Sequence, residues 1–287
     1  MKKKRRLFDY HTQTIEHGMN KQLLIKETVK AAIDRKLTAI CLTDHYPLPL
    51  DFVDSTHDDR VYYPDYLETF TIIQKKYKGE IEVLLGAEFD WFSQYTEWIR
   101  KEINKYPFDY VIGSVHYLGA IKDDDGERIF CHDFSKEEFM KGFRYFKEIK
   151  IIVKKYYKEV RNMVNSKLFD GVGHLDLIKK YNDGGLFDEN DKWYKDAVIE
   201  TLNIIASSGM VMEINTAGLD KPCKAQYPSF WIIKEAYERS IPITIGSDAH
   251  VPKNIGKNLD KAVQLAQKAG YKKLVRFVKR RKIEVNI

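Results

Sequence analysis

Cysteine is scarce in this sequence, and the three cysteines lie far apart. Cys41, Cys131 and Cys223 form no CxxC pair, and their number is not the even one that a disulfide framework needs. Cys41 lies inside an apolar run, where a thiol is typical of a small core residue. The pattern excludes a small disulfide-stapled scaffold.

Long apolar runs, linkers and repeats are missing as well. No stretch approaches the roughly 18 apolar residues that a membrane span needs. We find no Pro/Gly/Ser-rich linker, low-complexity segment or internal repeat, so we expect one domain over residues 1–287, a length that α/β barrels reach. The basic start, residues 1–6, is not followed by the apolar segment of a signal peptide. We therefore expect a cytoplasmic protein with no membrane partner.

The net charge of +6 favours anionic partners without identifying one. The basic residues are spread along amphipathic segments and the two ends of the chain. In the segment 272–282 the apolar positions indicate a helix packed on the core. A solvated basic face is favoured over a nucleic-acid patch, so a nucleic-acid partner is not expected.

Histidine and carboxylate residues recur at the ends of apolar runs. The chain has eight histidines. Only His57 and His132 fall outside this pattern, and His17 lies just after the first run. The runs 6–10, 39–43, 81–87, 110–115, 169–173 and 243–247 end at His11, Asp44-His45, Glu88, His116, His174 and Asp248-Ala249-His250.

Helical patterns lie between these runs, and a further strand is expected at 210–214. The helices are expected at 20–36, 63–78, 94–105, 136–164, 192–207, 228–239 and 259–268, with a last helix after them. Such alternation predicts a parallel sheet with helices outside it. The strand-to-helix loops are long and the helix-to-strand loops short, so the long loops gather where the histidines end up.

Strands of a parallel barrel all point the same way, so residues far apart in the sequence meet at its C-terminal mouth. Imidazole with carboxylate is the ligand mix that binds zinc, manganese or iron. The sequence therefore predicts a site for several metal ions at one end of an α/β barrel.

The motifs at these run ends, including His11-Thr12-Gln13, Gly173-His174 and Asp248-Ala249-His250, together resemble the polymerase-and-histidinol-phosphatase (PHP) family. The segments 169–180 and 213–219 resemble its histidinol-phosphatase branch. The resemblance implies a distorted seven-stranded (β/α) TIM-like barrel that holds two or three divalent ions. It also implies hydrolysis of a small phosphate monoester, with L-histidinol phosphate of histidine biosynthesis as the first candidate.

The family's ligand set is carried over residue by residue, with Glu88 expected to bridge two metals. It falls on His11, His17, His45, Glu88, His116, His174, Asp248 and His250. The family opens with His-x-His, whereas this chain has Gln13 at the second position. As a ninth candidate ligand, the harder amide oxygen of Gln13 predicts a more weakly held ion, or Mn²⁺ or Mg²⁺ in preference to Zn²⁺.

Asp44 and Asp176 are candidate catalytic residues, which would orient a neighbouring histidine or protonate the leaving alkoxide. For Asp176 a loop cap or a salt bridge is an equal alternative. The candidate phosphate-binding cations follow or precede the His174 motif. They are Arg161, Lys179 and Lys180.

A metal site suits the difficulty of this reaction. Phosphate-monoester hydrolysis needs accelerations up to about 10²¹-fold, whereas a positioned acid or base supplies only about 10²–10⁴. Two alternatives stay open. A nucleotide or nucleic-acid phosphoesterase of the same family lacks support from any aromatic-basic stripe, and a non-catalytic metal- or phosphate-binding barrel is favoured only by Gln13.

Overall fold

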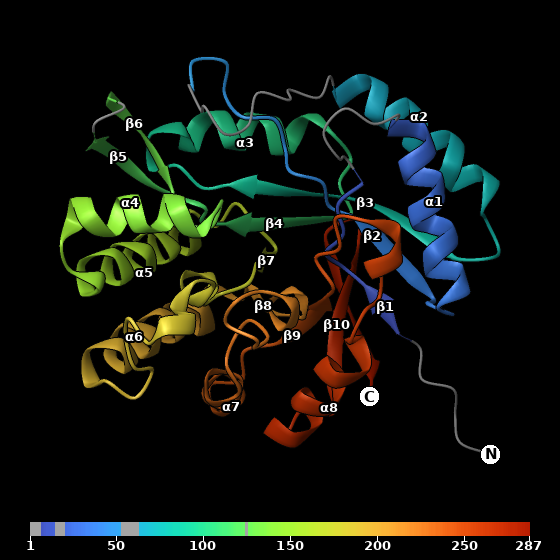
Figure 1. Cartoon of the computed structure of the whole chain (residues 1–287). Helices are drawn as coiled ribbons and strands as arrows, with labels where there is room; N and C mark the ends of the chain where they lie inside the picture. Colours follow the sequence, from blue (N-terminus) through green and yellow to red (C-terminus); the bar gives the residue numbers. More distant parts are fainter. Residues whose placement is uncertain (1–6, 15–20, 53–62, 124–125) are drawn as a thin grey trace.

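The computed structural model describes residues 7–14, 21–52, 63–123 and 126–287 (Figure 1). Seven strands of this part of the chain form one sheet in which every neighbouring pair is parallel. In sheet order they are β1 Phe8–Asp9, β2 Ala39–Leu42, β3 Glu82–Asp90, β4 Tyr110–Ser114, β7 Gly171–Val172, β8 Val211–Asn215 and β9 Ile243–Gly246. The expected seven-stranded parallel sheet is confirmed.

The two edges of the sheet meet between β9 and β1. The backbone N–H of Tyr10 donates to the carbonyl of Ile245 at 3.2 Å, and that of Asp248 donates to the carbonyl of His11 at 2.7 Å. A parallel bridge between Thr12 and Ala249 continues the contact past the strand ends. The sheet is therefore a nearly closed barrel, and its carboxyl ends surround one mouth.

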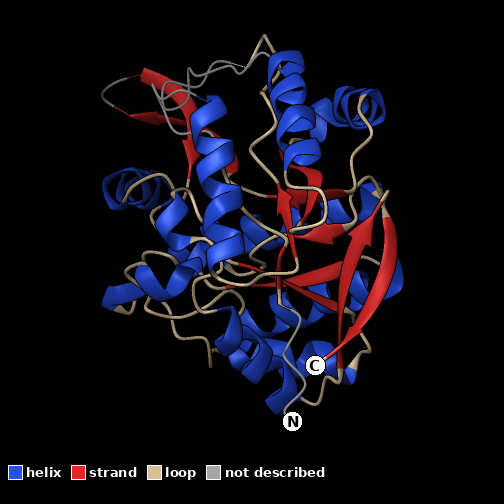
Figure 2. Cartoon of the chain, turned by 90° about the vertical axis from the view of Figure 1, so that its right-hand side faces the viewer, coloured by secondary structure: helices blue, strands red, loops and turns tan. Residues whose placement is uncertain are grey.

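Helices cover the outside of the barrel (Figures 1 and 2). Within the described ranges they are α1 Lys21–Asp34, α2 Tyr63–Lys76, α3 Thr96–Lys105, α4 Lys136–Phe146, α5 Ile149–Ser166, α6 Lys192–Ser208, α7 Phe230–Glu238 and α8 Leu259–Ala269. Each buries one apolar face, as α5 does with Ile152, Tyr156 and Val160. Short 3₁₀ turns lie at Ser93–Tyr95, Leu177–Lys179, Asn182–Gly184, Ala217–Asp220 and Pro252–Asn254.

The single helix expected over 136–164 is two helices. After α4, Lys147 takes a left-handed conformation with φ 65°, and its N–H donates to the carbonyl of Phe143. This cap ends the helix although the apolar periodicity continues past it. The break turns the chain so that α5 starts at Ile149.

Two hairpins replace expected irregular or helical segments. One of the expected long strand-to-helix loops, the one after β4, contains the antiparallel pair β5 Tyr117–Asp123 and β6 Gly126–Cys131. The helix expected over 272–282 is wrong: the segment forms the antiparallel hairpin β10 Lys273–Val278 and β11 Arg281–Asn286.

The β10/β11 hairpin forms because its turn is held by the barrel. Lys279 and Arg280 both have positive φ, 50° and 59°, and their N–H groups donate to the side chain and the carbonyl of Asp109 at 2.8 Å each. Phe277 stacks on Tyr110 with ring centroids 4.7 Å apart. Because Asp109 and Tyr110 lie at the start of β4, the hairpin covers the N-terminal end of the barrel, opposite the histidines.

No helix in the described ranges is long and apolar enough to cross a membrane.

Replacement of Phe277 by alanine should destabilise the protein by about 3–5 kcal/mol, because the ring is 1% exposed and its removal leaves a cavity under the barrel. Ile283→Ala on the other strand of the hairpin is the control; Ile283 is 36% exposed and should cost about 0.5 kcal/mol. Urea unfolding measures both. Equal urea midpoints for the two variants would show that Phe277 of the hairpin does not contribute to the barrel core.

Candidate metal centre

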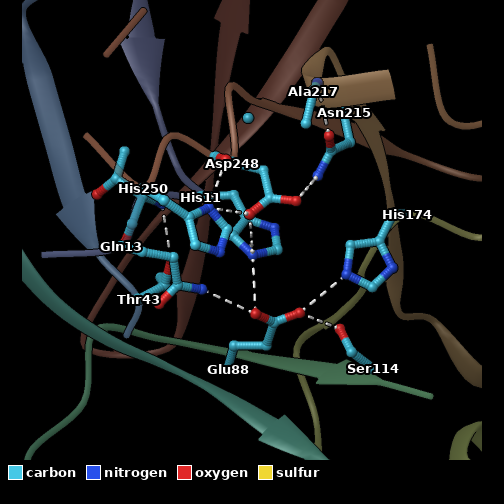
Figure 3. Close-up of polar contacts among 12 residues, drawn as sticks. His11, Gln13, Thr43, Glu88, Ser114, His174, Asn215, Ala217, Asp248 and His250 are labelled. Carbon is cyan, nitrogen blue, oxygen red and sulfur yellow. Dashed lines mark hydrogen bonds and ion pairs between the residues drawn. The ribbon is translucent and has the colours of Figure 1, made fainter. Parts of the chain in front are cut away.

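The carboxyl ends of the strands bring imidazoles and carboxylates into one cluster (Figure 3). His11 and Gln13 follow β1, His45 follows β2, Glu88 lies near the end of β3, His116 follows β4, His174 follows β7, and Asp248 and His250 follow β9. Seven of the eight ligands expected from the resemblance therefore lie at the mouth of the barrel. The eighth, His17, lies outside the described residues, as does most of the expected long loop after β2.

Glu88 lies at the centre of this cluster and is 1% exposed. Its Oε2 lies 3.1 Å from Nε2 of His11 and 3.5 Å from Nε2 of His45. Its Oε1 lies 2.9 Å from Nε2 of His174 and 3.7 Å from Nε2 of His116. Each carboxylate oxygen thus faces two imidazole nitrogens.

These separations are those expected between ligands of a common metal ion. Two donors bound tetrahedrally at about 2.0–2.1 Å from zinc lie about 3.4 Å from each other. In the described part of the chain, three groups of three residues could each hold a metal ion. Within each group, the possible ligand atoms lie within 4.8 Å of one another. The groups are His11, His174 and Asp248; His45, Asp90 and His116; and Glu88, His116 and His174. The residues present therefore fit divalent metal ions.

The charges in the cluster support ligation. Burial raises the pKa of the Glu88 carboxyl, but the imidazoles of His11 and His45 outweigh it and hold the pKa well below its usual value. The pKa of Asp248 is likewise lowered, since His11 and His250 outweigh the effect of burial. Both carboxylates are therefore ionised, as metal ligation requires.

Sequence reasoning missed Asp90, which also belongs to the cluster. Its Oδ1 accepts from Nδ1 of His116 at 2.5 Å, and its Oδ2 lies 3.9 Å from Nδ1 of His45. Burial lowers the pKa of His116, but the carboxylates of Asp90, Asp133 and Glu88 together outweigh it and raise the pKa to about 10. Positions i and i+2 of a strand share a face, so Glu88 already pointed to Asp90 if the strand continues, as β3 does.

Gln13 lies beside Glu88, and both ends of its amide are hydrogen-bonded. Its Oε1 accepts from the backbone N–H of His45 at 3.0 Å, and its Nε2 donates to Oε2 of Glu88 at 2.9 Å. A backbone N–H can only donate, so the amide oxygen must face His45. The amide nitrogen left facing Glu88 has no free lone pair for a metal. In this arrangement Gln13 holds Glu88 by a hydrogen bond, and its role as a ligand stays a prediction.

The two candidate catalytic aspartates both accept hydrogen bonds from neighbouring side chains. Asp44 accepts from the hydroxyl groups of Thr14 and Tyr66 at 2.7 and 2.6 Å, so it anchors the segment after β1. Asp176 is fully buried and accepts from Lys179 at 2.7 Å. This ion pair fits the alternative of a salt-bridge partner for Asp176, and a catalytic role of either aspartate stays a prediction.

The three candidate phosphate-binding cations lie in different surroundings. Arg161 donates to the hydroxyl of Thr201 and pairs with Glu200 on α6, so it is not turned to the cluster and its expected role is corrected. Lys179 is 2% exposed and bound to Asp176.

Lys180 is the candidate cation whose charge reaches the cluster. Its Nζ donates to the carbonyl and the carboxylate of Asp133 at 2.5 and 3.1 Å. Burial lowers the pKa of Lys180, but Asp133 outweighs it, with a smaller contribution from Asp248, and the pKa is raised. The ammonium of Lys180 is therefore held in its charged form beside Asp133.

Comparison with known proteins agrees with this geometry. The profile of the PHP domain matches residues 9–217. The chain belongs to the PHP family. It is 32% identical over 245 residues to the "Probable histidinol-phosphatase" of Deinococcus radiodurans, covering 85% of this chain and 87% of that protein. It is 28% identical over 271 residues to the histidinol-phosphatase of Lactococcus lactis, covering 94% and 93%.

A solved structure of the histidinol phosphate phosphatase of Lactococcus lactis, in complex with zinc, L-histidinol and phosphate, shares the fold. It superposes with a TM-score of 0.75 at 23% identity, over 97% of this chain and 99% of that one. The similarity confirms the PHP-type barrel.

Glu88→Gln should remove most of the bound metal, because it replaces the charged carboxylate that faces four imidazoles. The loss of affinity should exceed the roughly 10–100-fold cost of losing an outer hydrogen-bond partner. Elemental analysis of the purified protein measures it. Glu97→Gln on α3, where the side chain is 76% exposed, is the control. Equal metal content in all three proteins would contradict a central role of Glu88.

Gln13→His should raise zinc stoichiometry and resistance to chelators, because it places an imidazole beside Oε2 of Glu88 in place of an amide nitrogen. Gln13→Ala serves as the control that removes the hydrogen bond and adds no ligand. Activity is a poor readout, since a fuller site can help or harm turnover. Unchanged zinc content in Gln13→His would show that no metal lies within reach of position 13.

Proposed function

We propose that this protein is a metal-dependent phosphatase that hydrolyses L-histidinol phosphate to L-histidinol and phosphate. The observation that carries the proposal is the buried Glu88 carboxylate, which faces imidazoles from four strand ends. Membership of the PHP family and the names of the relatives support the reaction and the substrate.

The donor set suits two or three ions of zinc, manganese or iron. His11, His174 and Asp248 form one group of ligands, and Glu88 is shared with the neighbouring groups. When bound, such ions lower the pKa of water to roughly 7 and neutralise charge on the attacking and leaving oxygens. The chain itself supplies a rigid and largely buried frame, which makes these electrostatic effects stronger than in water.

Lys180 binds the substrate phosphate in this proposal. Its side chain is 14% exposed, and Asp133 holds it in place. The zinc, histidinol and phosphate named for the Lactococcus lactis structure support a small phosphorylated metabolite as the partner of this mouth.

We also propose that residues 1–287 fold as one domain. The hydroxyl of Tyr10, which follows β1, donates to the carbonyl of Phe277 at 2.7 Å, across 267 positions of the sequence. The C-terminal hairpin is thereby part of the same core as the first strand.

A phosphate-release screen of the purified protein tests the function. Histidinol phosphate, other small monoesters and short oligonucleotides would each be supplied with Zn²⁺, Mn²⁺ or Fe²⁺. Histidinol phosphate should be hydrolysed with the highest kcat/KM. Faster cleavage of oligonucleotide ends, or no release from any compound, would contradict the proposal.

Lys180→Met should raise KM for the phosphate ester by about 10-fold or more, because a charge-assisted contact contributes about 1.5–3 kcal/mol. Lys192→Met on α6 removes an equally charged side chain that is 88% exposed, and should leave KM unchanged. Steady-state kinetics with the metal that gives the highest rate measures both. The same KM in the two variants would remove Lys180 from the phosphate site.

A further inference from the structure

Strand β8 supplies no ligand expected from the sequence, yet it ends inside the cluster. Glu213 and Asn215 lie at positions i and i+2 and therefore share a face of the strand. They are 1% and 0% exposed. Polar side chains buried this deeply need partners, and theirs are the candidate metal ligands.

The Glu213 carboxylate joins ligands from two other strands. Its Oε1 lies 2.9 Å from Nδ1 of His11. Its Oε2 accepts from the backbone N–H of His174 at 2.9 Å. A carboxylate oxygen accepts, so Nδ1 of His11 carries the ring proton. Nε2 of His11 faces Glu88 and Asp248, at 3.1 and 3.5 Å, and would give its lone pair to a metal ion bound there.

Asn215 extends this arrangement to Asp248 (Figure 3). Its Nδ2 donates to Oε2 of Glu213 and to Oδ2 of Asp248, both at 3.2 Å. Its Oδ1 accepts from the backbone N–H of Ala217 at 2.9 Å, which fixes the orientation of the amide. Asp248 has φ 50°, a backbone conformation uncommon for a residue other than glycine. The backbone conformation of Asp248 thus limits where its side chain can point, and the hydrogen bond from Asn215 fixes the orientation of the carboxylate.

Gly246 on β9 shows how closely these groups approach. A Cβ at this position would lie 2.2 Å from Oε1 of Glu213 and 2.4 Å from Cβ of His11. Only glycine leaves room for the contact between Glu213 and His11. The contact is therefore built into the packing of three strands.

We propose that Glu213 and Asn215 are positioning residues for one metal pocket. Glu213 fixes the tautomer of His11 and the backbone of His174, and Asn215 aims Asp248. The three residues that they position, His11, His174 and Asp248, form one of the groups whose ligand atoms lie within 4.8 Å of one another. The inference rests on the metal centre of the proposed function. In it, residues of β8 orient metal ligands that other strands supply.

Two measurements on Glu213→Gln and Asn215→Ala test the proposal. The first is zinc affinity of the metal-free protein, from competition with a chromophoric chelator. Both variants should bind zinc about 10–100-fold more weakly, the usual cost of losing an outer partner of a ligand. The second is the ¹⁵N NMR spectrum of the histidine rings in the zinc-loaded protein, with the His11 signals assigned by their absence in His11→Asn. Glu213→Gln should lose the pure Nδ1–H tautomer of His11.

Met212→Leu is the matched control, because Met212 directly precedes Glu213 on β8 and points to the opposite face. It should change thermal stability without changing zinc affinity or the His11 tautomer. Zinc affinity within threefold of the parent in both Glu213→Gln and Asn215→Ala, with the tautomer unchanged, would overturn the proposal.

Neither measurement needs a substrate, so the two proposals fail separately. If the parent protein releases no phosphate but both variants lose zinc affinity, the proposed function is wrong and the role of β8 stands. If the parent is an active phosphatase and the variants bind zinc as it does, the role of β8 is wrong and the function stands.

Discussion

The structure depends on one buried negative charge, the carboxylate of Glu88. Removing a carboxylate from water costs several kcal/mol unless its oxygens find partners. Here Ser114 donates to Oε1 at 2.5 Å and Gln13 to Oε2 at 2.9 Å, and four imidazoles face the same two oxygens. So many donors around one carboxylate suit divalent cations as the counter-charge. The metal-dependent hydrolysis proposed for the protein follows from this grouping of four imidazoles around one carboxylate.

The barrel makes this concentration of ligands possible. Parallel strands place their carboxyl ends together, and the hydrogen bonds between β9 and β1 bring the first and last ligands of the sequence side by side. The β10/β11 hairpin covers the other end through Phe277 and Tyr110. Residues that stabilise the fold thus lie at the N-terminal end of the barrel and the candidate ligands at the C-terminal end, a division typical of such folds.

The seven parallel strands and most helices could be predicted from the sequence, because apolar runs and their polar ends carry that information. The C-terminal hairpin could not. Its apolar positions fit a helical period, and its turn uses Lys279 and Arg280 at positive φ, where neither residue is the usual choice. What holds the turn is Asp109, about 170 positions away in the chain.

The candidate site shows the same limit. Histidines at strand ends could be placed from the sequence, because the strand direction fixes where they meet. Asp90 could not be placed because it lies further along a strand that Glu88 seems to end. Glu213 lies inside the expected strand 210–214 and Asn215 directly after it, and no histidine at the end of that strand marks either of them as part of the site. Arg161 was placed near the site by its position in the sequence, but the face of a helix that a side chain occupies depends on packing, and it lies against α6. The direction in which the Gln13 amide points depends on a hydrogen bond that no sequence pattern displays.

The central claim is that Glu88 is shared between metal ions. Crystals grown with zinc and phosphate, measured on both sides of the zinc absorption edge, test it most directly. The account predicts anomalous peaks at about 2.0–2.2 Å from each of the two carboxylate oxygens of Glu88. Peaks confined to other residues, with none at bonding distance from Glu88, would contradict it.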